Sequence, residues 1–158
     1  VLTGASAPRF QGVEQMNGVE RNRYAEWGIG LLRAVVGLVF VMHGWQKVFQ
    51  FGVAGIEAGF TQTGIPLPGI SAPLVSFTEL IGGSLLLVGL FTRWVALPLA
   101  FTMVVAFFMV HLEHGFFLPQ GFEFVMVLFT ALVALVLAGP GAAALDNLIR
   151  RRRTDVPS

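Results

Sequence analysis

The sequence predicts an all-α integral membrane protein: a bundle of four transmembrane helices followed by a short helix at the membrane surface. Of the 158 residues, 55% are hydrophobic and only 12% are charged, about half the charged share of a typical soluble domain. The mean hydropathy is +0.76, and the apolar residues are gathered into four long runs. A chain with so few charges cannot cover a water-facing surface, so most of its surface is expected to face lipid.

Four segments are long and apolar enough for the roughly 20 helical residues that cross a bilayer core. They are residues 27–49, 73–91, 93–111 and 122–138. Ser71 and Pro73 are start signals for the second segment, Thr92 is expected to cap the third, and Gly-Pro-Gly at 139–141 ends the fourth. The first segment is too long for a signal-peptide core and no small-residue cleavage site follows it, so we expect it to be retained.

These segments divide the chain into three parts. Residues 1–24 form a polar N-terminal tail, residues 25–141 the transmembrane domain, and residues 142–158 a basic helix and tail. In the last part, Leu145, Leu148 and Ile149 recur at helical spacing beside a run of arginines. An amphipathic basic helix of this kind is expected to lie in the membrane interface.

The basic residues predict the orientation. Eight of them fall on one side of the predicted membrane: Arg9, Arg21, Arg23, Arg93 and the run from Arg150 to Arg153. The connections at 50–72 and 112–121 contain no Lys or Arg. The positive-inside rule therefore places both termini in the cytoplasm and the two longer connections outside. The basic C-terminus also suits an anionic inner leaflet.

Composition also excludes several classes of function. The chain has no cysteine, which rules out disulfides, a cysteine nucleophile, iron–sulfur ligation and c-type haem attachment within it. Its net charge is only +1 and the arginines are concentrated in the tails, so nothing indicates binding to nucleic acid. The expected partners are the lipid bilayer and other membrane-protein subunits.

The ionisable residues of the spans are expected to meet at one level, in the outer half of the bundle. His43 and Lys47 lie one turn apart near the outer end of the first span. Glu79 enters the second span from the same side, His111 closes the third, and Glu123 opens the fourth. We expect Lys47 to pair with Glu79 or Glu123 and both histidines to join that network, because an unpaired charge costs about 2.5–3.5 kcal/mol on insertion scales.

Four further polar residues belong to the candidate set. Arg33 lies one to two turns in from the cytoplasmic side, and Glu113 and His114 follow His111 at the outer end. Thr130 shares a helical stripe with Glu123, Met126 and Val127, and this stripe is expected to face the bundle interior.

Several of these stretches together resemble one known family. "LLRAVVGLVFVMHGWQKVF", "ELIGGSLLLVGLFTRWVALPLA", "HLEHGFF", "GFEF" and "LAGPGAAALDNLIR" are similar to the DoxX-like family of bacterial four-helix membrane proteins. The resemblance implies a bacterial inner-membrane location and an association with redox systems, namely a thiosulfate:quinone oxidoreductase subunit and membrane-bound oxidative-stress complexes. It carries over as candidate residues Arg33, His43, Lys47, Glu79, His111 and Glu123.

The polar residues leave four interpretations open. They could be an ion-pair network that fixes helix register, or a pocket for a quinone or another small redox substrate, bound without a covalent link. The protein could instead be a non-catalytic accessory subunit of a respiratory or photosynthetic complex. A metal site is less favoured, because the His-x-x-His spacing at 111–114 is a weak signal and no stronger metal motif is present, and a haem held between His43 and His111 is the least favoured. Whether the chain is itself an enzyme stays open.

Overall fold

The computed structural model describes the backbone of residues 9–154 and the side chains of residues 22–149, and all its regular structure is helical. Its elements follow one another along the chain: α1 (Arg9–Trp45), a π-helical turn (Gln46–Gln50), α2 (Gly52–Gln62), α3 (Pro68–Val88), α4 (Thr92–Ala106), a second π-helical turn (Phe107–His111), a 3₁₀ turn (Leu112–His114), α5 (Glu123–Ala138) and α6 (Leu145–Thr154).

The helices match a membrane-spanning architecture. Three helical stretches, Asn22–Gln50, Pro68–Val88 and Thr92–His114, are long and apolar enough to cross a bilayer. The fourth, α5, is apolar but has only 16 residues. The all-α membrane fold predicted from the sequence is therefore confirmed, with a fourth helix at the short end of what a bilayer requires.

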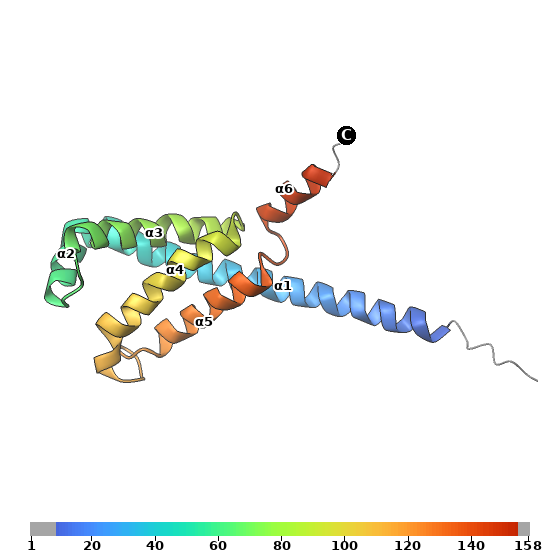
Figure 1. Ribbon diagram of the computed structural model, residues 1–158, viewed down its shortest axis with the longest axis horizontal. Helices are drawn as coiled ribbons and strands as arrows, with labels where there is room; N and C mark the ends of the chain where they lie inside the picture. Colours follow the sequence, from blue (N-terminus) through green and yellow to red (C-terminus); the bar gives the residue numbers. More distant parts are fainter. Residues whose placement is uncertain (1–8, 155–158) are drawn as a thin grey trace, which may run out of the picture.

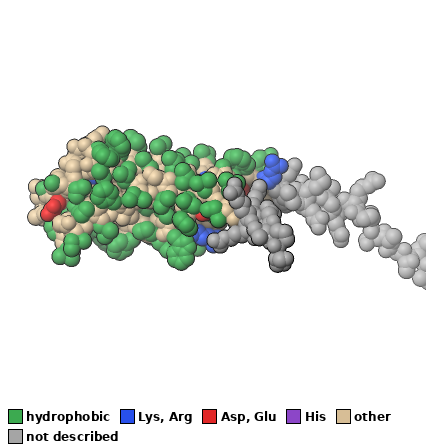
Figure 2. Space-filling view, turned by 90° about the horizontal axis from the view of Figure 1, so that it is seen from above, with side chains coloured by type: hydrophobic (Ala, Val, Ile, Leu, Met, Phe, Trp, Pro, Cys, Tyr) green, Lys and Arg blue, Asp and Glu red, His purple; other side chains and the backbone are tan. Residues whose placement is uncertain are grey.

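The four long helices pack around a shared core. α3 lies beside α1, α4 packs on α3, and α5 packs on α4 and also contacts α1 (Figure 1). The core side chains come from all four helices: Val36, Phe40, Leu86, Leu99, Met103, Val125, Leu128, Leu132 and Leu135 are each at most 7% exposed. Hydrophobic side chains also cover most of the outer face seen in Figure 2, while charged ones lie mainly near its ends. An apolar exterior around an apolar core is the arrangement expected in lipid.

Glycines allow α1 and α3 to touch backbone to backbone. A Cβ atom built on Gly37 of α1 would lie 2.6 Å from the backbone nitrogen of Leu87. A Cβ atom on Gly83 of α3 would lie equally close, 2.6 Å, to the backbone nitrogen of Val41, and one on Gly44 would lie 2.4 Å from that of Leu80. Small residues at helix contacts permit this close approach in membranes. Gly37 therefore packs against α3 of the same chain.

The structure also contains helix that the sequence reading did not predict. α1 begins at Arg9, so most of the segment read as a polar tail continues the first helix, and Figure 1 shows it projecting beyond the bundle. The long connection after α1 contains α2. Neither segment carries a long apolar stripe, and residues 9–24 include several good helix formers without one. Long apolar runs, the signal that predicts membrane-spanning helices, are therefore absent from both segments.

The N-terminus of α4 is capped by a residue far away in the sequence. Thr92, expected to be the cap, is fully buried inside the first turn, and its hydroxyl has no hydrogen-bond partner. The carboxylate of Asp146 on α6 accepts hydrogen bonds from the backbone N–H groups of Phe91, at 2.8 Å, and Thr92, at 3.0 Å. A carboxylate is favoured there because it complements both the free N–H groups and the helix dipole. The prediction of a Thr92 cap was wrong because a tertiary contact supplies the acceptor.

The α1–α3 contact leads to a test of stability. We expect Gly37→Ala to destabilise the protein by about 1–3 kcal/mol, because its methyl group would collide with backbone that has no room to move. Gly28→Ala on the same helix is the matched control, since nothing lies within 4 Å of a Cβ atom there. Thermal unfolding of the two variants in one detergent measures the difference. Equal unfolding temperatures would mean that α1 and α3 are not in backbone contact.

Candidate functional site

A cavity of about 440 Å³ lies at the end of the bundle opposite the α3–α4 turn. Its walls are mostly apolar and come from all four long helices, with Phe60 of α2 and Leu118 of the α4–α5 connection also contributing. The two longer connections therefore meet at the same end of the bundle (Figure 1). The volume falls within the ~300–1,000 Å³ usual for small-molecule sites.

A direct ion pair forms part of the cavity wall. Lys47, in the π-helical turn after α1, donates a hydrogen bond from Nζ to Oε2 of Glu79 on α3. Glu79 is only 3% exposed, whereas the Lys47 side chain keeps 20% of its surface accessible. Burying a carboxylate in an apolar wall is costly unless a cation compensates it, and the close α1–α3 contact brings the cation within reach. Of the two partners considered for Lys47, the structure selects Glu79.

Two histidines line the same cavity. His43 lies one turn before Lys47 on α1, and the centroid of its ring is 6.2 Å from that of Phe124 on α5. Nδ1 of His111 is 2.6 Å from the backbone oxygen of Gln120. Because a carbonyl oxygen only accepts hydrogen bonds, Nδ1 must carry a proton. In neutral His111, Nε2 is then the acceptor nitrogen, and it becomes a donor when the ring is protonated.

Lys47 and His111 both belong to π-helical turns. The turns are Gln46–Gln50 after α1 and Phe107–His111 after α4. Such turns are rare in proteins as a whole, but they occur often at functional sites. They change the direction of a side chain without ending the helix. Both occur at the level of the cavity, so each aims an ionisable side chain at it. Nothing in the residue types predicted either turn.

Glu123 is close to the cavity but is not among its lining residues. Its Oε1 accepts a hydrogen bond of 2.8 Å from the backbone N–H of Leu118, which fixes the connection between α4 and α5. Glu113 and His114 are exposed, and Nδ1 of His114 lies 2.9 Å from the backbone oxygen of Val110. None of these three residues lines the cavity.

The inward face predicted for the fourth span was wrong. Met126, Val127 and Thr130 are exposed, and the Thr130 hydroxyl donates to the backbone oxygen of Met126 within its own helix, at 2.9 Å. The buried face carries Val125, Leu128, Leu132 and Leu135. That apolar series recurs every three or four residues, so the helical period could have identified it. The prediction was wrong because it rested on one charged residue, Glu123, at the start of the helix.

Arg33 lies apart from the cavity, at the other end of the bundle. Its guanidinium is buried and donates to backbone carbonyls only: those of Leu86 and Leu87 at the end of α3, and those of Pro140, Ala142 and Ala143 before α6, at 2.7–3.2 Å. A guanidinium has enough N–H groups to satisfy a helix end, where carbonyls have no partner within the helix. Grouping Arg33 with the candidate site was therefore wrong, since it holds α1, α3 and the segment before α6 together.

Sequence reasoning missed the neutral part of the site. Thr102 of α4 is 8% exposed, lines the cavity and donates its hydroxyl to the backbone oxygen of Leu99 at 2.7 Å. Phe60 and Ile65, from α2 and the turn after it, also line the cavity. A search for charged residues cannot find these side chains. Within residues 22–149 no three histidine or carboxylate side chains gather as metal ligands would.

Comparison with known proteins finds one family model that matches the chain. The DoxX family model matches residues 28–112, more than half of the chain. The putative oxidoreductase CatD of Bacillus subtilis is 35% identical over 81% of this chain and 91% of its own length. The inner membrane protein YqjF of Escherichia coli is 31% identical over 79% of this chain and 94% of its own length.

An uncharacterized membrane protein of Mycobacterium tuberculosis is also similar, with 31% identity over 97% of this chain and 96% of its own length. No solved structure matches the chain. The matched family region contains His43, Lys47, Glu79 and His111, the four ionisable residues of the cavity. The helical membrane fold, the family match and the near full-length relatives agree: the chain belongs to the DoxX family of membrane proteins.

Proposed function

We propose that the cavity binds the head group of a lipid-soluble quinone, or a small redox substrate of similar polarity, and that the chain is a subunit of a redox-linked membrane complex. The observation that supports this most directly is the Lys47–Glu79 ion pair facing a mostly apolar cavity between two histidines. Ionisable groups inside a membrane protein are costly and commonly mark substrate or proton pathways. The name of CatD, a putative oxidoreductase, is consistent with redox chemistry.

The cavity offers what a quinone head requires. Quinone carbonyl oxygens accept hydrogen bonds, and the Lys47 ammonium and the His43 ring can supply donors from α1. On the other side of the cavity, His111 adds a ring nitrogen whose role changes with protonation. Glu79 can exchange a proton with Lys47, its partner in the ion pair. The aromatic and aliphatic walls suit the ring itself.

A redox partner completes the chemistry of this proposal. Reducing a quinone to a quinol takes up equal numbers of electrons and protons. The protonatable side chains of the cavity can deliver the protons, and a redox-active partner subunit delivers the electrons. The chain's role is then to hold the quinone head and to supply protons to it.

A second candidate function is that of a non-catalytic accessory subunit. It is favoured by the position of the ion pair directly beside the close α1–α3 contact, where it could serve only to fix two helices together. Under this alternative the cavity has no ligand. Binding measurements separate the two functions, because both predict that loss of the ion pair destabilises the fold.

We further propose that the cavity lies toward the outer face of the membrane. The end with the α3–α4 turn carries Arg93 and lies beside α6, whose sequence includes Arg150 to Arg153. The connections that close the cavity carry no Lys or Arg. This difference supports both termini in the cytoplasm of a bacterial cell.

The quinone proposal is tested by direct binding. We expect the purified chain in lipid nanodiscs to bind a short-tailed quinone saturably, measured by calorimetry. His43→Ala and His111→Ala should each weaken binding about tenfold, the equivalent of one lost hydrogen bond to ligand. His114→Ala, outside the cavity, is the control and should bind as the wild type does. No saturable binding, or equal effects of all three substitutions, would favour the accessory role.

The ion pair is tested by a double-mutant cycle. We expect Glu79→Gln to lower the free energy of unfolding by about 2 kcal/mol, because it leaves the Lys47 ammonium without a counter-charge, though partly accessible. Adding Lys47→Met should recover part of this loss. The control Glu57→Gln, at an exposed position on α2, should be neutral. Additive losses in the double variant would show that the two residues do not interact.

The orientation is tested by labelling, which the absence of native cysteine makes simple. We expect Gln62→Cys on α2 to react with a membrane-impermeant maleimide in intact cells. Asn22→Cys on α1, also at an exposed position, should react only after the membrane is permeabilised. The reverse pattern would place the cavity on the cytoplasmic side.

A further inference from the structure

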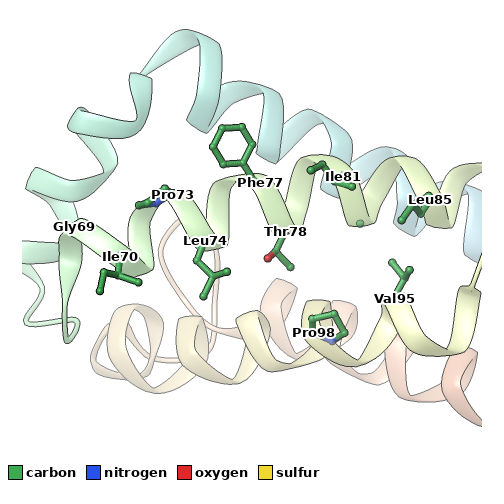
Figure 3. A pocket seen from close by; sticks show the side chains of 11 residues that line it. Gly69, Ile70, Pro73, Leu74, Phe77, Thr78, Ile81, Leu85, Val95 and Pro98 are labelled. Carbon is green, nitrogen blue, oxygen red and sulfur yellow. The ribbon is translucent and has the colours of Figure 1, made fainter.

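A second hollow lies on the lipid-facing side of the bundle, between α3 and α4. It encloses about 700 Å³ and is lined by Ile70, Leu74, Ile81 and Leu85 of α3 and by Val95 and Pro98 of α4. Figure 3 shows Leu74 and Thr78 pointing from α3 toward α4, with Val95 and Pro98 opposite. Among the side chains that line this groove, all of them described by the structure, only Thr78 carries a polar atom. The groove is therefore suited to a hydrocarbon.

The groove and the cavity are adjacent through both helices. On α3, Val75 lines the cavity and Thr78, three residues later, lines the groove. On α4, Pro98 lines the groove and Thr102, four residues later, lines the cavity. Residues three or four apart are neighbours on one helix face. The two hollows therefore lie on adjacent faces of α3 and α4, on either side of the contact between these helices.

The shape of the groove favours a single extended chain as its occupant. From Ile70 to Leu85 the groove follows about 22 Å of α3, at 1.5 Å per residue. Its lining supplies no polar partner other than the Thr78 hydroxyl, so an occupant that also reaches the neighbouring cavity is an apolar chain joined to a polar head. A flexible apolar tail can follow the groove and bend between the helices at the level of Glu79.

We infer that the groove between α3 and α4 holds the isoprenoid tail of the quinone whose head lies in the cavity. This inference rests on the proposed function, since it identifies the ligand as a long-tailed, membrane-resident quinone rather than a water-soluble redox substrate. The head then enters between α3 and α4 from the bilayer, past Val75 and Thr102. The tail stays in the groove along Leu74, Ile81 and Leu85.

Photolabelling tests where the tail lies. The wild-type chain in phosphatidylcholine nanodiscs is irradiated with a quinone that carries a diazirine on an isoprenoid tail, and labelled peptides are identified by mass spectrometry. We expect the label within residues 69–98 and its loss when an unlabelled tailed quinone is added. Label distributed equally over α1 and α5 would overturn the inference. So would groove labelling by a photoreactive phospholipid that the tailed quinone fails to displace.

Two matched tryptophan variants separate the tail site from the head site. Leu74 lines the groove and is 64% exposed, whereas Leu31 of α1 is 67% exposed and lines neither hollow. We expect Leu74→Trp to weaken binding of the tailed quinone about fivefold and to leave a tail-less quinone unaffected. Leu31→Trp should change neither affinity.

The result with each quinone shows which proposal fails. If the wild type binds both quinones but Leu74→Trp and Leu31→Trp behave alike, the head-group site stands and the tail groove is overturned. If the wild type binds neither quinone, the proposed function itself fails and the inference with it.

Discussion

The close contact between α1 and α3 determines the rest of the structure. Gly37 and Gly44 on α1 and Gly83 on α3 leave no side chain between the two backbones. In lipid there is little hydrophobic drive to pack one apolar helix on another, so close van der Waals contact must replace it. The same contact places Lys47 beside Glu79, which allows two charges to exist inside an apolar wall. Without glycine at these positions the helices would separate and each charge would face hydrocarbon alone.

The two ends of the bundle use polar groups in different ways. At the α3–α4 turn, Arg33 and Asp146 satisfy free backbone groups at helix ends, and their partners are carbonyls and N–H groups. At the cavity, Lys47 and Glu79 pair with each other, and His43 and His111 keep ring atoms at the cavity wall. The first end is saturated by the fold itself. The second places ionisable groups on the wall of a mostly apolar cavity, an arrangement typical of ligand sites.

The sequence predicted what depends on composition and long apolar runs, namely the helical membrane fold and its apolar segments. It also predicted Glu79 as one of two candidate partners of Lys47, and the structure confirms that pair. It could not predict what depends on tertiary contact. Asp146 became the cap of α4 because α6 folds back, and Arg33 left the candidate site because carbonyls of α3 and of the segment before α6 surround it.

Backbone irregularity was equally inaccessible to residue patterns. The π-helical turns that carry Lys47 and His111 arise from residues that would also form an ordinary α-helix. The face of α5 was misjudged for a different reason. One carboxylate at its start was given more weight than the apolar series Val125, Leu128, Leu132 and Leu135, although that series determines which side is buried.

The hydrogen bonds of Arg33 have a mechanical consequence. They fasten α1 to the last turn of α3 and to the segment before α6, and Asp146 fastens α6 to the first turn of α4. These three anchor points lie at one end of the bundle. Any separation of α3 from α4 must therefore pivot about that end, and the displacement must grow with distance from it. Helix separation is therefore smallest at the α3–α4 turn and increases through Glu79 toward the end of the bundle that holds the cavity.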